Sequence, residues 1–267
     1  MFLVLLSYAL LFSACKKDPS STTQRTPVTA SPAQPVVQSG PDTSGSKLGQ
    51  VRLEFYNQVD GDALVFGKKY LNAHGDTFTV KKFQYYISNV QFLKQDTLVS
   101  EKESYHLVDH AVATRTAFVV TPLETGTYTT MRLTIGIDST RNCSGVQSGD
   151  LDPLKNMFWT WNSGYIFLKL EGSSPSSDQN NSIVFHIGGY AGWNKAQRQL
   201  TFKLPNALIV RENSSPVIRC VVNVNEIFKT PNTIDFKTQN YQMTPGASAK
   251  MLADNYQDMI SIGSVQN

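Results

Sequence analysis

The stretch F-T-V-K-K-F-Q-Y-Y-I-S-N-V-Q-F-L, residues 78–93, decides the fold class. Aromatic and β-branched residues fill most of its positions, and these residue types favour strands because they pack well on a pleated surface. The stretch is longer than a typical strand of roughly five or six residues. It therefore predicts one long, bent strand or two strands in succession.

Shorter runs on both sides of this stretch repeat the strand pattern. Apolar and polar residues alternate at 51–55, 131–137, 200–204 and, late in the chain, 217–228, with Gly, Asp and Asn gathered between the runs. Helical spacing is visible only at 247–259. We predict an all-β fold, an antiparallel β-sandwich, whose core face includes Leu133, Ile135, Phe185, Ile187, Phe202 and Leu204.

The N-terminal segment indicates where the protein works. Residues 2–14 form an apolar run that is too short to span a bilayer as a helix, and the run ends in Leu11-Phe12-Ser13-Ala14-Cys15, which resembles a bacterial lipobox. We therefore expect residues 1–15 to be a lipoprotein signal with an acylated Cys15. Such an anchor implies a place in the cell envelope, at the outer membrane facing the periplasm or the cell surface. The alternative is an ordinary secretory signal with an incidental cysteine.

Residues 16–48 have the composition of a flexible, disordered tether. They are rich in Pro, Ser, Thr and Gln and contain no aromatic residue, so they cannot bury enough apolar surface to fold. Four basic and two acidic residues give this segment +2 of the net charge of +3. The remainder, expected to be one domain at 49–267, is nearly neutral and has no electrostatic attraction for nucleic acid.

The motifs of common enzyme classes are missing from the sequence. It has no Gly-x-Ser-x-Gly elbow, no phosphate-binding glycine loop and no His-Glu-x-x-His. Asp150 and Asp152 precede a proline, a setting in which acidic residues are more often turn formers than a general acid and base. We therefore expect that the protein is not an enzyme.

Two cysteines lie within the expected domain. Cys220 shares strand parity with Val222 and should face the core, whereas Cys143 lies in a loop. The pair either forms a disulfide, which an exported compartment permits, or remains as two thiols.

His186 is the leading candidate metal ligand among the histidines. Ile183, Phe185 and Ile187 take the core face of the expected strand, so His186 points to the opposite face, just before two glycines that allow a ligand or backbone to come close. The alternative is a surface histidine with ordinary partners. His74 lies in a Gly-Asp turn and reads as solvent-exposed.

A set of motifs runs through nearly the whole domain. They are Tyr85-Tyr86-Ile87-Ser88-Asn89-Val90, Tyr105-His106-Leu107-Val108-Asp109, Asn142-x-Ser144-Gly145, Gly149-Asp150-Leu151-Asp152-Pro153, Met157-Phe158-Trp159-Thr160-Trp161-Asn162-Ser163-Gly164-Tyr165, Lys169-x-Glu171-Gly172 and Phe185-His186-Ile187-Gly188. In order and spacing this set resembles the MbnP-like copper-binding family, of the methanobactin-associated partner-protein type. The Trp-x-Trp segment is its most specific part.

The resemblance implies an exported β-sandwich that binds copper. It also implies that a tryptophan is oxidised to kynurenine by a di-haem MauG-like partner of the cytochrome c peroxidase type, with Trp159 and Trp161 as the two candidates. We expect His186 to be the first copper ligand and His106 the second, with Met157 adding a thioether, because imidazole and sulfur donors select copper.

The chain departs from the copper-binding members at two places. Ser88 stands where a further ligand histidine is expected, and Gly189-Tyr-Ala-Gly-Trp193 replaces the cysteines that follow the family's His-x-Gly motif. These departures leave an alternative open, a metal-free outer-membrane accessory lipoprotein that binds a small ligand or a protein through its aromatic face. Carbohydrate binding on exposed tryptophans is a third possibility.

Overall fold

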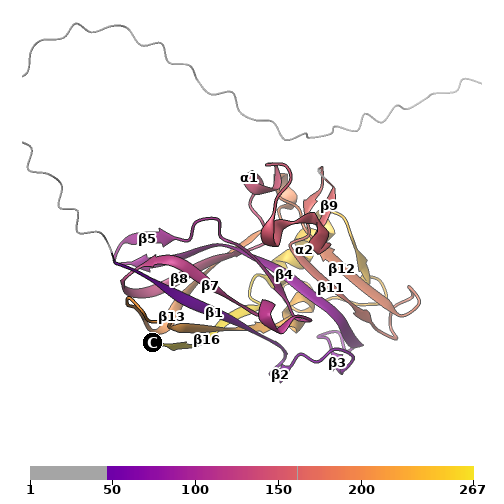
Figure 1. Ribbon diagram of the computed structural model, residues 1–267. Coiled ribbons are helices and arrows are strands. Elements are labelled where there is room, and N and C mark those ends of the chain that lie inside the picture. Colours follow the sequence, from indigo (N-terminus) through magenta and orange to yellow (C-terminus); the bar gives the residue numbers. More distant parts are fainter. Residues whose placement is uncertain (1–46, 161) are drawn as a thin grey trace, which may run out of the picture. The chain divides into compact units, whose positions relative to one another are not determined.

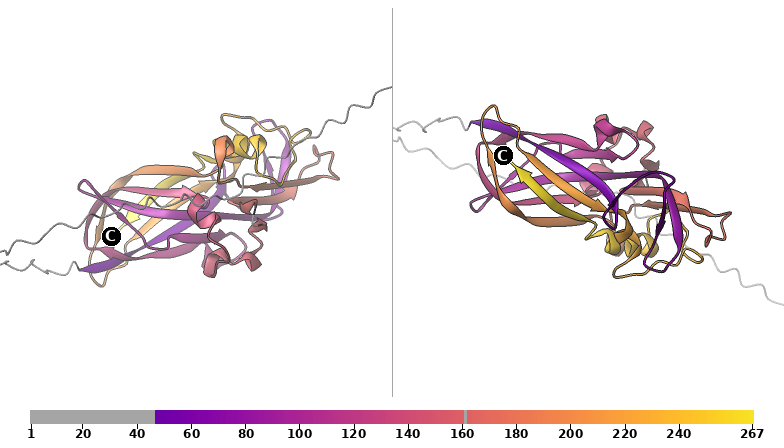
Figure 2. Two further views of the ribbon diagram at one scale, coloured as in Figure 1. Left: turned by 90° about the horizontal axis from the view of Figure 1, so that it is seen from above. Right: turned by 90° about the horizontal axis from the view of Figure 1, so that it is seen from below.

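Two main β-sheets form the part of the molecule that this computed structural model describes, residues 47–160 and 162–267. The sheets are the two layers of a β-sandwich, as Figures 1 and 2 show. The predicted all-β fold class is confirmed. The predicted signal with Cys15, most of the predicted tether, and Trp161 lie outside the described residues.

The smaller sheet is built around β1. Its strand order is β16-β14-β1-β2, and β7 also pairs with β1. The strands are β1 (Leu48–Val59), β2 (Asp62–Ala63), β7 (Ala117–Glu124), β14 (Val217–Asn223) and β16 (Ile260–Gln266). Because β1 and β14 run parallel, the sandwich is mixed and not purely antiparallel as predicted.

The larger sheet is built around β4 and has the order β13-β8-β4-β11-β12-β15, with β3, β5 and β6 also paired to β4. Its strands are β3 (Lys69–Leu71), β4 (Thr77–Lys94), β5 (Thr97–Ser100), β6 (Tyr105–Asp109), β8 (Gly126–Ile135), β11 (Leu168–Ser173), β12 (Ser182–Ile187), β13 (Arg198–Val210) and β15 (Tyr241–Gln242).

The fold-deciding stretch forms a single long strand, β4, with a bulge. The register to β8 shifts between Ser88 and Gln91, and Asn89 adopts a left-handed backbone with φ of 52°. Asn tolerates this conformation better than most residues. The bulge is the predicted bend, and it lets one strand pair with β11 along its first half and with β8 along its second half.

The two sheets pack through aromatic and branched side chains. The rings of Phe55 on β1 and Tyr85 on β4 lie 6.2 Å apart, and Tyr85 Oη donates a 2.9 Å hydrogen bond to Asn57 Oδ1. The predicted core residues Leu133, Ile135, Phe185, Ile187 and Leu204 are buried as expected, whereas Phe202 is only partly buried against the core.

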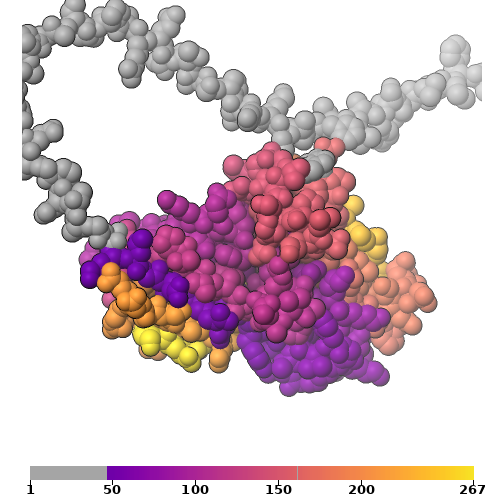
Figure 3. Space-filling view, viewed as in Figure 1, coloured from indigo at the N-terminus to yellow at the C-terminus, as the bar shows by residue number. Residues whose placement is uncertain are grey.

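A segment of short elements covers the outer face of the larger sheet. It contains α1 (Ser139–Asn142), the 3₁₀ turns η2 (Gly149–Leu151) and η3 (Pro153–Lys155), and the paired strands β9 (Phe158–Thr160) and β10 (Gly164–Tyr165). Tyr86 on β4 anchors this segment because its hydroxyl donates to the carbonyl oxygen of Asp150 at 2.8 Å. Figure 3 shows the segment as a salmon-coloured block on the surface.

Asp150 and Asp152 are structural residues of this covering segment, in agreement with their interpretation as turn formers. Asp150 accepts from the Leu107 amide at 2.9 Å and pairs with Arg115 at 2.7 Å. The Asp152 side chain caps η3 by accepting from the Leu154 amide. These contacts tie the segment to β6 and to the 3₁₀ turn η1 (Ala113–Arg115).

The C-terminal part departs from the predicted long strand at 217–228. The strand β14 ends at Asn223, whose side chain accepts from the Asn225 amide and starts the 3₁₀ turn η5 (Val224–Phe228). Cys220 on β14 faces the core as predicted and is free, so the expected alternative of a Cys143–Cys220 disulfide is not formed.

Two further elements complete the described chain, the 3₁₀ turn η4 (Gly192–Asn194) and the helix α2 (Ala247–Tyr256). The helix confirms the helical spacing seen at 247–259. None of the helices among the described residues has the length and apolar character needed to cross a bilayer.

Candidate functional site

A row of four polar side chains crosses the outer face of the larger sheet. Strand pairing places His186 opposite Lys169, Lys169 opposite Gln84, and Gln84 opposite Asp109. Directly paired residues of antiparallel strands point to the same face. We call these four residues the polar row. Its far end is fixed by a 2.8 Å hydrogen bond from Gln84 Nε2 to Asp109 Oδ2.

His186 ends the polar row on β12 and is nearly buried, with 7% of its surface exposed. Its Nε2 lies 2.9 Å from Glu171 Oε1, and Lys82 Nζ lies 3.6 Å from the other oxygen of that carboxylate. Burial lowers the pKa of His186, although the hydrogen bond to Glu171 acts in the opposite direction. We therefore assign a neutral imidazole at pH 7, with the proton on Nε2 because the carboxylate is the acceptor.

The second ring nitrogen, Nδ1, carries the lone pair of this tautomer. Nδ1 is buried, and it has no hydrogen-bond partner among the described residues. A histidine that binds a metal usually donates its other N–H to a carboxylate or carbonyl, which fixes the ring and raises its basicity. Glu171 holds His186 in this arrangement, so the orientation of the imidazole suits a metal ligand.

Trp159 on β9 packs just beyond the end of β12, the strand that carries His186. A methyl group built on Gly188 would come within 2.8 Å of Cζ3 of Trp159, so the indole packs directly on that glycine. Gly188 is two residues beyond His186, and residues two apart in an extended chain share a face. The indole Nε1 is also buried and without a described hydrogen-bond partner. One buried, unsatisfied nitrogen thus lies on β12, and another belongs to the indole that packs on the glycine just beyond this strand.

Lys169 places a positive charge next to His186 in the polar row, and this charge disfavours the binding of a cation there. Burial, and secondarily the neighbouring Lys82, lowers the pKa of Lys169. Its Nζ donates to the carbonyl oxygen of Asn156 in the covering segment. The negative charge of Glu171 acts in the opposite direction and favours the charged form of Lys169.

The structure does not bring His106 to His186. Asp109 belongs to the polar row, and His106 precedes it by three residues on β6, so its side chain points to the other face. Three strand spacings of about 4.8 Å also separate β6 from β12. His106 Nε2 instead lies 2.8 Å from Glu101, and its ring stacks on Phe118 with centroids 3.6 Å apart. The predicted pair therefore cannot bind one ion.

The remaining predicted site residues have different positions. Met157 is completely buried in the hydrophobic core, where it serves packing, and its role as a thioether ligand stays a prediction. Ser88, where a ligand histidine was expected, donates a buried 2.7 Å hydrogen bond to the Gly136 carbonyl oxygen.

Sequence reasoning gave no role to Glu171 and Lys169, although both lie in one of the quoted motifs. Both alternate with Leu168 and Leu170 on β11, so their off-core parity was readable. Their proximity to His186 could not be predicted from the sequence, because it depends on which strands are neighbours in the sheet.

Comparisons with known proteins agree with the resemblance seen in the sequence. The sequence model of the MbnP family matches residues 48–246. The solved structure of MbnP from Methylosinus trichosporium superimposes with a TM-score of 0.56 at 13% identity, covering 81% of this chain and 99% of that chain. Comparison with the curated proteins finds no match.

Proposed function

Because the chain belongs to the MbnP family, we propose that it is a copper-handling protein of the cell envelope that binds copper through Nδ1 of His186. One observation carries the proposal. His186 is a buried imidazole whose Nε2 is held by Glu171 and whose Nδ1 is unsatisfied. Imidazole nitrogen is a donor that suits copper.

A single imidazole is a small ligand set, and Trp159 is the residue best placed to enlarge it. Conversion to kynurenine cleaves the C2–C3 bond of the indole with addition of two oxygen atoms, one of which becomes a ketone, and hydrolysis then releases C2 as formate and frees an aromatic amine. The ketone and the amine are two groups that could bind a metal. We propose that a di-haem, MauG-like partner, as implied by the family resemblance, catalyses this oxidation with a peroxide as the oxidant. The contact of the indole with Gly188, two residues from His186, supports Trp159 as the modified residue.

Copper titration of the full chain tests the proposal, before and after exposure to the di-haem partner. His186→Ala should abolish copper binding. His106→Ala is the matched control, because it removes another carboxylate-bound histidine from the opposite face and should leave binding unchanged. Equal binding by the wild type and His186→Ala would refute the assignment. Intact-mass measurement on the wild type and Trp159→Phe identifies the modified tryptophan.

The envelope location rests on Cys15. Cys15→Ala should move the protein from the membrane fraction to the soluble fraction of its host. Retention in the membrane, together with an unacylated wild-type mass, would contradict the anchor.

A second function, binding of a small ligand or protein through an aromatic surface without metal, is favoured by Trp193. This side chain on η4 is 96% exposed, a rare environment for tryptophan. A wild-type protein that binds no copper but loses a partner on Trp193→Ala would support this alternative.

A further inference from the structure

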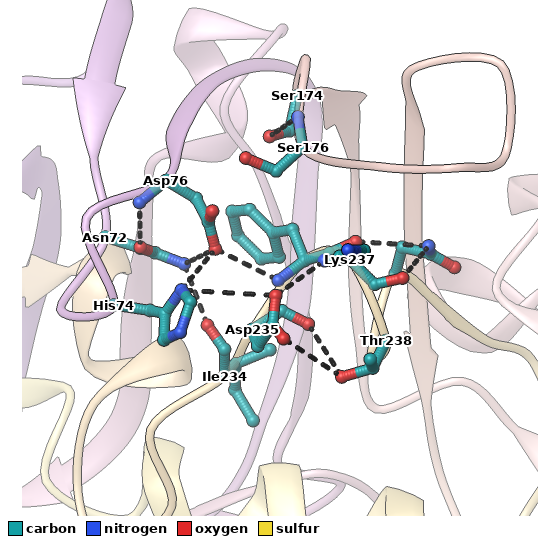
Figure 4. Close-up of polar contacts among 11 residues, drawn as sticks. Asn72, His74, Asp76, Ser174, Ser176, Ile234, Asp235, Lys237 and Thr238 are labelled. Atoms are coloured by element: carbon teal, nitrogen blue, oxygen red, sulfur yellow. Dashed lines mark hydrogen bonds and ion pairs between the residues drawn. The ribbon is translucent and has the colours of Figure 1, made fainter.

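Three side chains with metal-binding atoms gather at a place separate from His186. His74 and Asp76 lie in the turn between β3 and β4, and Asp235 follows η5. One ligand atom from each lies within 4.8 Å of the other two, and no other such group occurs among the residues that the structure describes. Figure 4 shows the three side chains converging from these two segments.

The distances are close to those of a bound transition metal. His74 Nδ1 lies 3.1 Å from Asp76 Oδ2 and 4.0 Å from Asp235 Oδ1. Bonds of about 2.0–2.2 Å from zinc to nitrogen and oxygen place tetrahedral ligand atoms roughly 3.3–3.6 Å apart. Side-chain adjustments of less than about 1 Å would therefore complete three corners of a tetrahedron, and the fourth corner is left for water.

The chemistry of the donors selects the class of cation. Calcium takes about six to eight oxygen ligands, and magnesium keeps most of its waters, so neither favours an imidazole with two carboxylates. Zinc readily binds this mixture of nitrogen and oxygen. A divalent cation also balances the two carboxylate charges.

The carboxylates are held in place by the backbone behind them. Asp76 is 8% exposed, and its Oδ2 accepts from the Phe236 amide at 3.0 Å and from Asn72 Nδ2 at 3.3 Å. Asp235 Oδ1 accepts from the Lys237 amide at 2.8 Å. Hydrogen bonds of this kind orient metal ligands in known sites.

The same contacts join two segments that are far apart in the sequence. Asn72 Nδ2 donates to the Ile234 carbonyl oxygen at 2.9 Å, and its Oδ1 accepts from the Asp76 amide at 2.7 Å. The half-exposed His74 covers the two carboxylates from the solvent side, with 48% of its side chain accessible. The cluster is thus open to an ion from solution on one side and rigid on the other.

We propose that His74, Asp76 and Asp235 form a binding site for a zinc-class divalent cation. The ion binds Nδ1 of His74, in place of the hydrogen bond between this nitrogen and Asp76, and one oxygen of each carboxylate. It ties the turn before β4 to the segment after η5, so it stabilises the folded chain by mass action. The site shares no residue with the His186 region.

Zinc titration of the full, tag-free chain, first stripped with a chelator, tests this site by calorimetry and by thermal unfolding. The wild type should bind one zinc ion in this cluster and unfold at a higher temperature when zinc is present. His74→Ala should weaken zinc binding about tenfold or more and remove the thermal shift. Asp235→Asn should do the same, and it retains an oxygen to accept from the Lys237 amide.

His186→Ala is the matched control and should keep both zinc binding and the thermal shift. Comparing the His74→Ala and His186→Ala variants keeps the two proposals distinguishable. Loss of copper binding by His186→Ala would not affect the test of zinc binding at His74. Zinc binding by His74→Ala and Asp235→Asn equal to the wild type would overturn the site. A wild type with no bound zinc and no thermal shift would also overturn it and leave His74 as a hydrogen-bond partner of Asp76.

Discussion

Gly188→Ala is the substitution that probes most directly how the Trp159 indole is held. The added methyl group would lie 2.8 Å from Cζ3 and 3.1 Å from Cη2 of Trp159, and it would overlap the carbonyl oxygen of Tyr165. The backbone at Tyr165 cannot retreat easily, because hydrogen bonds fix both sides of it. The Tyr165 amide donates to Asn142 at 3.0 Å, and the Ile166 amide donates to the Met157 carbonyl oxygen at 2.9 Å.

The expected magnitude follows from two opposing effects. Replacing Gly by Ala without strain stabilises a protein by about 0.4–1 kcal/mol through the unfolded state. Overpacking a closed site destabilises by about 1–3 kcal/mol, and the upper part of that range applies because one of the blocking atoms is backbone. We expect the free energy of unfolding to fall by about 2 kcal/mol. With a slope of about 2 kcal/mol per molar urea, the unfolding midpoint moves down by about 1 M.

Urea unfolding followed by circular dichroism measures this effect. Gly192→Ala is the control in open space, where the left-handed backbone alone (φ +68°) should destabilise by about 1 kcal/mol. Adding Trp159→Ala to Gly188→Ala should give a coupling of at least about 0.5 kcal/mol, because the ring is part of the obstruction. A Gly188→Ala protein as stable as the wild type, or additive with Trp159→Ala, would refute the proposed contact.

Three further predictions test the fold. Phe202→Ala should lower the free energy of unfolding by about 2–3 kcal/mol, as measured by urea unfolding. This is less than the roughly 3–5 kcal/mol expected for a fully buried phenylalanine, because Phe202 is only partly buried. A loss of more than about 3 kcal/mol would mean that the ring is more enclosed. Burial raises the pKa of Cys220 to about 12, so iodoacetamide should label it only after unfolding, as peptide mass spectrometry would detect, and labelling of the native protein would contradict its burial. Burial raises the pKa of Asp138, but hydrogen bonds, from Tyr105 foremost, outweigh burial and lower the pKa overall. The ionised Asp138 therefore stabilises the folded state at pH values above the unfolded-state pKa of about 3.9. This stabilisation is lost as the pH falls through the lower pKa of the folded state. The wild type should therefore exceed Asp138→Asn in stability at pH 7 by more than at pH 3, and a constant difference would exclude that ionisation.

The positions of the strands, and the face to which each side chain points, were predictable from the sequence. The alternation of apolar and polar residues reflects directly which side chains are buried. Leu133 and Ile135 are completely buried, and the parity of Cys220 was predicted correctly. The end of β14 was not predictable, because the buried Val224 and Phe228 of the following 3₁₀ turn continue the apolar pattern. Only the Asn223 cap separates the strand from the turn.

The candidate site was predictable one strand at a time but not across strands. The parity of His186 was correct, since it follows from its own neighbours in sequence. The partnership with His106 failed because the face of each strand in the sheet depends on register. Residue 109, and not residue 106, is the position of β6 that lies in line with His186.

The four histidines differ in what surrounds their second ring nitrogen. A carboxylate beside the first ring nitrogen does not distinguish them, because three of the four have one. His74, His106 and His186 each place one ring nitrogen 2.8–3.1 Å from a carboxylate. His106 lies flat against a phenylalanine ring, which makes it a packing residue. His110 has both nitrogens occupied, by an asparagine side chain and a backbone carbonyl. His186 retains an unsatisfied nitrogen, and His74 has a second carboxylate within 4.0 Å, so of the four histidines these two combine a held ring with a further feature that a metal site needs.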